Sequence, residues 1–389
     1  MRTTAQCGFI KSDGVIEIMK KVLHISKYYY PFRGGTEQIA QDCVNALCEK
    51  FNQKVICFNH EKGDSNDFVD NIEIIRCGCF TKISSQALSF SYWKRLKETM
   101  KSFNPDIVIF HYPNPFVASL LLSCIPSHTK LVVYWHLDIV KQKVLGRFFF
   151  GQNRELIKRA NKLIATSPNY VEGSPWLSSA REKCVVVPNC INEGRLQETE
   201  ESKRLAEEIR EKNKGKIICL AVGRHTEYKG FKYLIQASKL LDDRFQIFIA
   251  GKGELTEELK REAMGDDKVH FLGVVSDNEL KAYLSAMDIY CFPSITKNEA
   301  FGLALAEGMY FGKPAVTFNI PGSGVNYVCL DGETGIEVEN RNVKKYADAL
   351  MKLANVTELR NKYGEAGRKR VIENFLDSQF GENVREVIV

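Results

Sequence analysis

The chain has 389 residues, which is more than one hydrophobic core usually serves, because single cores stop growing near ~250–300 residues. Its composition, 44% hydrophobic and 26% charged residues, is typical of a folded globular protein and excludes collagen-like, low-complexity and disordered chains. The net charge of +6 is unevenly shared: residues 1–190 carry 25 Lys and Arg against 16 Asp and Glu, a balance of +9, whereas residues 191–389 carry −3.

The first eighteen residues have no apolar signal-peptide core, and Met19 stands directly before the first strand pattern. We therefore expect 1–18 to form a poorly ordered extension. The 12 cysteines include no C-x-x-C pair and lie mostly in apolar runs, which favours buried, reduced thiols over disulfides or a zinc site. The longest apolar run, Phe116 to Ile125, is about half as long as a membrane span. These features predict a cytoplasmic protein.

From residue 21 onward, short apolar or β-branched runs alternate with helical periodicity. In the first half we expect strands at 21–26, 54–58, 72–76, 106–110, 130–135, 162–166 and 184–187, and helices near 36–50, 88–103, 115–123 and 150–161. In the second half we expect strands at 216–222, 245–250, 268–272, 288–292 and 314–318, and helices near 229–242, 255–264, 276–287, 300–311, 341–354 and 357–375. Because several strands are apolar on both faces, the pattern predicts two doubly wound, parallel-sheet α/β domains.

The polar stretch from Asn192 to Lys216 separates the two halves, so we place the N-terminal domain at 19–190 and begin the second domain at 191. Ligands of open parallel sheets bind outside the carboxyl ends of the strands. The loops that follow the strands, and a cleft between the two sheets, are therefore the expected place for chemistry.

Two loops with paired glycines follow strands and precede helices. Gly34 and Gly35 suit an anion such as phosphate at a helix N-terminus, although a plain tight turn explains them nearly as well. Gly251 and Gly253 follow the strand 245–250, but the third glycine of a G-x-G-x-x-G dinucleotide motif is replaced by Thr256. This replacement disfavours a nicotinamide enzyme.

The loop from Gly223 to Gly230 places two cations, Arg224 and Lys229, between a strand and the next helix. Arg offers a planar fork of donors and Lys a point charge, and a helix N-terminus adds to both, so the pair suits a diphosphate. Two solvated loop cations are the alternative interpretation.

The strongest pattern is E-x7-E, formed by Glu299 and Glu307 after the strand 288–292. On a helix these residues would be ~12 Å apart along the axis, which is too far for two carboxylates that flank one glycosidic bond. We therefore expect them to contact different parts of one long ligand. As a capping acid and a surface acid, they would need no ligand at all.

Two further pairs stand at the carboxyl ends of strands: His136 with Asp138, and His111 with Tyr112. This is where ligands bind in such sheets. A lone histidine is more often structural than catalytic, and that alternative stays open for both pairs.

Together these segments resemble the retaining glycosyltransferases of family 4, which have the GT-B fold of two Rossmann-like domains facing a central cleft. The resemblance covers about residues 20–380. It rests on Gly223-Arg224 with Lys229-Gly230 and on the E-x7-E motif, supported by Gly34-Gly35, His136-x-Asp138 and Pro188-Asn189. It implies that residues 191–370 bind a nucleotide sugar and that a C-terminal helix, 371–389, returns to the first domain.

The resemblance also implies a role for each matching residue. The implied catalytic residues are His136, near the donor sugar, Arg224 and Lys229, on the diphosphate, and Glu299, on the sugar hydroxyls. The implied donor-binding residues are Gly34, Gly35, Gly223, Gly251, Gly253, Val274, Ala300, Phe301, Gly302, Leu303 and Glu307, the last on the ribose. The implied acceptor-side residues are His111, Tyr112 and Asp138. No metal or cofactor is implied, and the chain lacks the D-x-D pair that Mn-dependent GT-A enzymes usually show.

The stretch from Tyr134 to Lys143, with His111-Tyr-Pro-Asn114, resembles a branch of the family that builds bacterial surface polysaccharides such as O-antigen and includes mannosyltransferases. It implies transfer of a hexose to a lipid-linked glycan, with GDP-mannose as the first donor expected and UDP-glucose, UDP-galactose and UDP-GlcNAc left open. The family often has P-N-G-V/I-D where this chain has Pro188-Asn189-Cys190-Ile191-Asn192, so we treat that segment as an interdomain turn.

Two other functions share this architecture. A nucleotide-sugar 2-epimerase would isomerise a UDP-sugar without an acceptor, and the acid and base residues of its own pattern are not found here. A non-catalytic nucleotide-sugar-binding subunit would be expected to lack at least one of Arg224, Lys229 and Glu299, and all three are present.

The positive balance of the first half gathers in two segments, Tyr92–Lys101 and Lys141–Arg159. Basic residues interleaved with Trp and Phe suit an anionic membrane surface, on the inner face of the cytoplasmic membrane. A solvated helix face explains them equally well. No nucleic-acid-binding motif accompanies this charge, so we expect no nucleic-acid partner.

Overall fold

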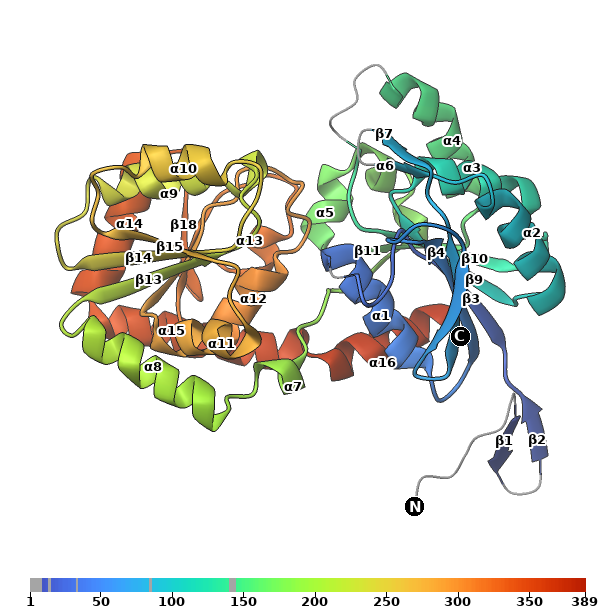
Figure 1. Cartoon of the computed structure of the whole chain (residues 1–389), viewed down its shortest axis with the longest axis horizontal. Helices are drawn as coiled ribbons and strands as arrows, with labels where there is room; N and C mark the ends of the chain where they lie inside the picture. The colour runs from blue at the N-terminus through green and yellow to red at the C-terminus, as the bar shows by residue number, and fades with distance from the viewer. Residues whose placement is uncertain (1–8, 13–14, 33, 84–85, 140–144) are drawn as a thin grey trace. The chain divides into compact units, whose positions relative to one another are not determined.

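The computed structural model describes residues 9–12, 15–32, 34–83, 86–139 and 145–389 (Figure 1). Contacts within the chain divide it into two compact units. The first unit contains the residues up to Thr166 together with Ser174–Val187 and Phe380–Val389. The second unit contains Ser167–Gly173 and Pro188–Gln379, so the main division falls close to the expected boundary at 190.

The first unit is built on one sheet of eight strands in the order β12-β11-β10-β9-β3-β4-β6-β5. All neighbours are parallel except β5 and β6. The strands are β3 (Lys21–Ile25), β4 (Asn52–Phe58), β5 (Ser65–Val69), β6 (Ile72–Cys77), β9 (Ile107–Tyr112), β10 (Lys130–Trp135), β11 (Lys162–Ala165) and β12 (Cys184–Val186). Every residue of β9 is buried, as a central parallel strand with apolar faces on both sides requires.

The helices of the first unit include one from the far end of the chain. They are α1 (Gly35–Leu47), α2 (Tyr92–Phe103), α3 (Pro115–Cys124), α4 (Leu145–Arg159), α6 (Pro175–Ser178), the 3-10 turn η1 (Arg181–Lys183) and most of α16 (Asp377–Ile388). Lys130 donates to the carbonyl oxygens of Val387 and Ile388 at 3.1 and 2.9 Å, and Arg385 donates to the carbonyl oxygen of Ala46 at 2.9 Å. These bonds hold the end of α16 in the first unit.

The second unit is built on six parallel strands in the order β15-β14-β13-β16-β17-β18. They are β13 (Ile217–Val222), β14 (Phe245–Ala250), β15 (Val269–Gly273), β16 (Ile289–Phe292), β17 (Ala315–Phe318) and β18 (Gly335–Val338). The other elements are α5 (Pro168–Gly173), α7 (Glu193–Leu196), α8 (Glu200–Lys212), η2 (Glu227–Lys229), α9 (Phe231–Ser238), α10 (Thr256–Glu262), α11 (Asp277–Ala286), α12 (Leu303–Tyr310), α13 (Val325–Val328), α14 (Val343–Asn355) and α15 (Thr357–Asn374). A continuous hydrophobic core joins the sheet to most of these helices.

In both sheets the strand order reverses beside the first strand of the domain pattern. β3 lies between β4 and β9, and β13 lies between β14 and β16. The loops after the two strands at such a switch point leave toward opposite faces of the sheet and open a crevice where ligands bind. This topology confirms the predicted doubly wound α/β architecture of two Rossmann-like units.

Some strands were not expected from the sequence. β5 is an antiparallel edge strand with the polar sequence Ser65-Asn-Asp-Phe-Val69, and β18 closes the other sheet with a glycine at its first position. A short antiparallel pair, β7 (Thr81–Ile83) and β8 (Gln86–Leu88), precedes α2. In the segment expected to be poorly ordered, β1 (Phe9–Ser12) and β2 (Val15–Ile18) form an antiparallel pair, while residues 1–8, 13 and 14 lie outside the described part.

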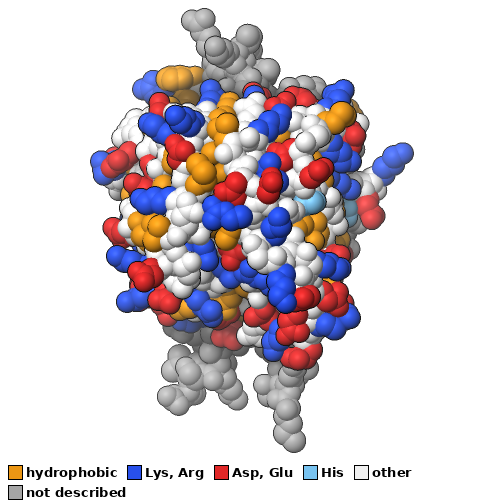
Figure 2. All heavy atoms as spheres, turned by 90° about the vertical axis from the view of Figure 1, so that its left-hand side faces the viewer, with side chains coloured by type: hydrophobic (Ala, Val, Ile, Leu, Met, Phe, Trp, Pro, Cys, Tyr) orange, Lys and Arg blue, Asp and Glu red, His pale blue; other side chains and the backbone are white. Residues whose placement is uncertain are grey.

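Eleven cysteines of the described chain form no disulfide, and most of them are buried, as their apolar surroundings predicted. No helix in the described residues is both long and apolar enough to span a membrane. On the face drawn in Figure 2, basic and acidic side chains are interspersed. That face is the left-hand side of Figure 1, where the elements of the second unit are drawn.

Candidate active site

In the second unit, the predicted donor-binding residues gather on loops at the carboxyl edge of the sheet, around the switch point between β13 and β16. The loop after β13 runs from Gly223 through η2, and the loop after β16 runs from Pro293 to Gly302, where α12 begins. The nitrogen of Ile295 donates to the carbonyl oxygen of Tyr228 at 2.9 Å, so the two loops are joined by a backbone bond. The sequence placed Lys229 and Glu299 in these loops without showing that they meet.

Lys229 and Glu299 form an ion pair across these loops. Their side chains are only 11% and 12% exposed, and Ser294 donates a second hydrogen bond to the same Glu299 oxygen at 3.0 Å. Burial alone lowers the pKa of Lys229, but the nearby carboxylate outweighs burial, and the pKa lies above its ordinary value. Lys229 is therefore positively charged, and the Glu299 carboxylate holds its ammonium group in position. Arg224, in the same loop, has an exposed side chain.

Glu307 lies one turn inside α12, and its partner is Arg195 of α7. The same guanidinium also reaches Asp277 at 3.4 Å. Tyr310, three residues after Glu307, donates to the carboxylate of Glu193 at 2.9 Å, so α7 and α12 are joined at two points. Burial raises the pKa of Glu307 above its ordinary value, and Arg195 opposes this shift. Sequence reasoning missed Arg195, because the partner is 112 positions away.

The glycines of these loops allow strands and loops to approach closely. A side chain on Gly251, whose φ is +120°, would come within 2.0 Å of the carbonyl oxygen of Gly223. One on Gly230 would come within 2.1 Å of the carbonyl oxygen of Pro293. These contacts explain why the loops after β13 and β14 need glycine at these positions, whatever ligand they bind.

Thr256, which stands where a dinucleotide motif has its third glycine, has a structural role. Its hydroxyl accepts from the nitrogen of Gly253 and bonds the Nδ1 atom of His225, both at 2.9 Å. His225 is fully buried and belongs to the loop that carries Arg224 and Lys229. Thr256 thereby ties the loop after β14 to the loop after β13.

The remaining predicted donor-binding residues flank α12 and β15. Gly302 has a φ of +96° and precedes the first residue of the helix, Leu303, while Phe301 is buried beneath it. Gly324 packs closely against Ala300: a side chain on Gly324 would come within 2.1 Å of the Ala300 carbonyl oxygen. Val274, directly after β15, is 68% exposed.

In the first unit, the residues predicted at the reaction centre and on the acceptor side are buried. Nδ1 of His111 lies 3.0 Å from Nε2 of His136. Tyr112 stacks on Trp135 with ring centroids 3.9 Å apart, and its hydroxyl donates to Asn153. Asp138 accepts hydrogen bonds from the indole of Trp135 and the hydroxyl of Ser174. The structure therefore gives Asp138 structural partners, and an acceptor role for these residues stays a prediction.

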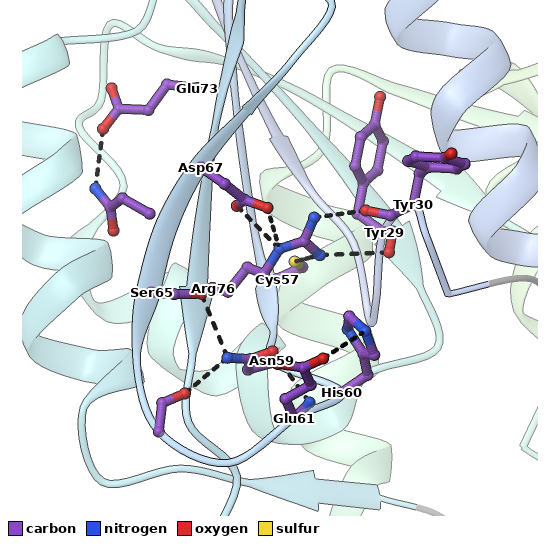
Figure 3. A network of polar contacts seen from close by, with 12 residues as sticks. Tyr29, Tyr30, Cys57, Asn59, His60, Glu61, Ser65, Asp67, Glu73 and Arg76 are labelled. Carbon is purple, nitrogen blue, oxygen red and sulfur yellow. Dashed lines mark hydrogen bonds and ion pairs between the residues drawn. The ribbon is translucent and has the colours of Figure 1, made fainter.

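Arg76 of β6 hydrogen-bonds the loop that precedes Gly34 and Gly35 (Figure 3). The guanidinium is 2% exposed, donates from Nε to both oxygens of Asp67 at 3.0 Å, and donates to the carbonyl oxygens of Tyr29 and Tyr30. Gly34 precedes α1, and a side chain there would come within 2.3 Å of a Glu37 carboxylate oxygen. No local sequence motif predicted this role of Arg76, because its partners lie on other strands and loops.

Within the described residues, no group of three or more His, Cys, Asp or Glu side chains is arranged to hold a metal ion. Independence from metal remains a prediction.

Known proteins identify the family. A model for group 1 glycosyl transferases matches residues 202–370, and a model for glycosyltransferase family 4 matches residues 33–195. The chain is 31% identical over 359 residues to O-antigen chain mannosyltransferase C of Escherichia coli, across 91% of this chain and 94% of that protein. The chain belongs to the family 4 glycosyltransferases. This glycosyltransferase is also 32% identical over 328 residues to the D-rhamnosyltransferase WbpZ of Pseudomonas aeruginosa, across 82% of each protein.

Solved structures agree on the fold. Sucrose-phosphate synthase from Thermosynechococcus elongatus superimposes with a TM-score of 0.76 at 16% identity, covering 95% of this glycosyltransferase and 98% of that chain. The Anabaena protein HepE in complex with UDP and glucose gives 0.73 at 16% identity, covering 95% and 99%. This glycosyltransferase therefore has the GT-B fold, as the sequence motifs predicted.

Proposed function

We propose that this glycosyltransferase moves a hexose from a nucleotide sugar to a growing, lipid-linked surface glycan, with mannose from GDP-mannose as the first donor to test. The observation that carries the proposal is the buried Lys229–Glu299 pair at the switch point of the second unit, with Arg224 on the same loop. The relatives named O-antigen chain mannosyltransferase and D-rhamnosyltransferase support the surface glycan and the class of sugar.

The chemistry follows from these charges. When the nucleoside diphosphate leaves, negative charge builds on its phosphate while the sugar becomes oxocarbenium-like. Lys229 would stabilise the leaving oxygens, Glu299 would bind sugar hydroxyls, and Glu307 would bind the ribose. We propose that no metal takes part and that the anomeric configuration is retained, the leaving phosphate accepting the proton of the acceptor on the same face.

A panel of nucleotide sugars tests the donor. We would measure the shift in melting temperature and the turnover with GDP-mannose, UDP-glucose, UDP-galactose, UDP-GlcNAc and a nucleotide-activated D-rhamnose, each with and without EDTA. We expect GDP-mannose to give the largest shift and turnover, and EDTA to leave the rate unchanged. Isomerisation of a UDP-sugar without an acceptor would instead identify an epimerase, and binding of a donor without any transfer would identify a binding subunit.

We further propose that the first unit docks on an anionic membrane, where a lipid-linked acceptor resides. Phe80 and Phe90 stack with centroids 4.0 Å apart and are 53% and 83% exposed, just before α2, whose residues Lys94, Lys97 and Lys101 are exposed. Arg95 does not belong to this surface, because it donates to the carbonyl oxygen of Arg76 and pairs with Asp64. Of the second basic segment, Lys141 and Lys143 lie outside the described residues.

Vesicle flotation tests the membrane proposal. At low salt we expect binding to vesicles with anionic lipid and loss of binding when Lys94, Lys97 and Lys101 are changed to Glu. The matched control changes Lys203, Lys212 and Lys214, exposed lysines of the second unit, to Glu. Equal losses in both triple variants, or no binding by the unaltered protein, would refute docking through α2.

A further inference from the structure

Three buried histidines form a row across neighbouring strands of the first unit. His24 lies on β3, His111 on β9, and His136 directly follows β10. All three are at most 4% exposed. The rings of His24 and His111 have centroids 6.3 Å apart with planes at 20°, and those of His111 and His136 have centroids 5.2 Å apart with planes at 10°. Because the three imidazoles are buried side by side, the position of each ring proton determines which hydrogen bonds they can form.

The first ring has an assigned proton. The amide nitrogen of Gln53 donates to the carbonyl oxygen of Val44 at 3.0 Å, so the Gln53 oxygen must face His24, whose Nε2 lies 2.8 Å away. An amide oxygen only accepts, so Nε2 of His24 carries the hydrogen. Its Nδ1 is then a bare lone pair, and this atom has no hydrogen-bond partner in the described structure.

The three rings are neutral near pH 7, so each carries one ring proton. Burial lowers the pKa of His24 to about 4 and that of His136 to about 3. Burial, followed by the neighbouring rings of His136 and His24, also lowers the pKa of His111. A neutral imidazole has one donor nitrogen and one acceptor nitrogen.

The bond between His111 and His136 then has two arrangements. If Nε2 of His136 donated, His111 would carry its hydrogen on Nε2, which is buried and has no partner among the described residues. If Nδ1 of His111 donates, that buried Nε2 is only a bare lone pair. Buried N–H groups without a partner are rarer than unused acceptors, so the second arrangement is favoured.

We propose that His111 is a positioning residue that holds His136 in its Nδ1–H tautomer. Nε2 of His136 is occupied by His111, and only Nδ1 remains to meet a ligand. His136 would therefore present a hydrogen-bond donor, and not an acceptor, to the donor sugar. This consequence for catalysis rests on the proposed function, whereas the tautomer itself does not.

Nitrogen NMR on protein labelled with ¹⁵N-histidine tests the proposal without any substrate. Long-range proton–nitrogen correlations distinguish the two neutral tautomers, and loss of one pattern in His136→Gln assigns the signal among the 7 histidines. Free neutral histidine prefers Nε2–H. We expect Nδ1–H for His136 in the unaltered protein, and an Nε2–H pattern there would overturn the proposal.

Two variants separate positioning from packing. His111→Phe keeps a ring but has no donor, so the Nδ1–H form of His136 loses its stabilising partner and a share of the Nε2–H form should appear. His111→Asn places an amide nitrogen at the same distance along the side chain as Nδ1 and should restore Nδ1–H. An unchanged tautomer in the Phe variant, or no restoration in the Asn variant, would refute the role of His111. Should the Phe variant not fold, the unaltered protein and the Asn variant still decide.

Activity provides the second readout. With the identified donor, we expect His111→Phe to lower kcat roughly tenfold, as loss of one hydrogen bond would, with little change in the donor KM, and His111→Asn to recover most of it. If no donor is turned over, the proposed function fails, but the tautomer of His136 still confirms or refutes the positioning.

Discussion

The ammonium group of Lys229 and the carboxylate of Glu299 pair across two loops that follow different strands, β13 and β16. The pair is nearly dry, with a positive charge held in place before any ligand arrives. A preset charge of this kind needs no reorganisation when charge develops on a leaving group.

Replacing Lys229 tests whether this preset charge stabilises the leaving diphosphate. We expect Lys229→Ala to lower the rate of sugar transfer by roughly 10²–10³-fold, the usual effect of losing one preset charge-stabilising donor. Lys232→Ala is the matched control, because Lys232 is exposed on the next helix and stacks over Tyr233. Steady-state kinetics with the identified donor measure both variants, and equal rates for Lys229→Ala and the unaltered enzyme would exclude a role on the diphosphate.

Arg195 should set the pH range over which Glu307, the carboxylate proposed to bind the ribose, is ionised. Arg195 opposes the rise in the pKa of Glu307 that burial causes, so Arg195→Ala should raise this pKa further. At a given acidic pH more Glu307 would then be protonated, and nucleotide affinity should begin to fall at a higher pH than in the unaltered enzyme. Calorimetric titration with the nucleoside diphosphate from pH 5 to 8 measures this shift. Arg204→Ala, which removes an exposed pair with Glu208, should leave the pH profile in place.

Two glycines with positive φ separate backbone strain from close contact. Gly265, with φ of +81°, has no atom within 4 Å of an added side chain, whereas Gly251 would meet the Gly223 carbonyl oxygen at 2.0 Å. We expect Gly265→Ala to cost about 1 kcal/mol of unfolding free energy, through strain alone. Gly251→Ala should cost clearly more and also weaken donor binding. Urea denaturation measures the unfolding free energy of both variants. Similar losses in the two would show that the loops can move apart at little cost to relieve the contact.

The hydrogen bonds of the buried Arg76 guanidinium, whose partner Asp67 is 45% exposed, are expected to stabilise this edge of the sheet (Figure 3). Arg76→Met leaves the backbone carbonyl oxygens of Tyr29 and Tyr30 without this donor, whereas the half-exposed Asp67 carboxylate can be solvated by water. The substitution should therefore cost about 1–3 kcal/mol. Arg204→Met, which breaks an exposed pair, should cost at most about 0.5 kcal/mol. Chemical denaturation compares the two. A loss for Arg76→Met as small as that of Arg204→Met would show that the network contributes little.

The sequence was sufficient for features with a local pattern. Apolar runs such as Ile107–Phe110 predicted the central strands, because a buried parallel strand has no polar face. The loop residues Lys229 and Glu299 were predicted as site residues because glycine and charge follow a strand and precede a helix. Two of the edge strands, β5 and β18, were not predicted, although the edge strands β12 and β15 were. β5 has one neighbour and a polar sequence, and it could be recognised only from its partner β6.

Contacts between distant positions could not be predicted. Arg195 and Glu307 are 112 positions apart, and Arg76 and Tyr30 are 46 apart, so no periodicity links either pair. His111 and His136 were both identified as site residues, but their bond depends on the order in which β9 and β10 pair in the sheet. The order of strands in a sheet cannot be read from the local pattern of a single sequence.

The two bonds that join α7 to α12 have a consequence for building hybrid enzymes. Arg195 and Glu193 contact Glu307 and Tyr310, so the short turn that opens the second unit is part of the surroundings of the proposed ribose carboxylate. A hybrid that takes its first unit from a relative should therefore be joined near Val187, so that α7 and α12 come from one parent. A junction placed after Leu196 would give Glu307 a foreign neighbour and alter nucleotide binding, although no residue of the second sheet had changed.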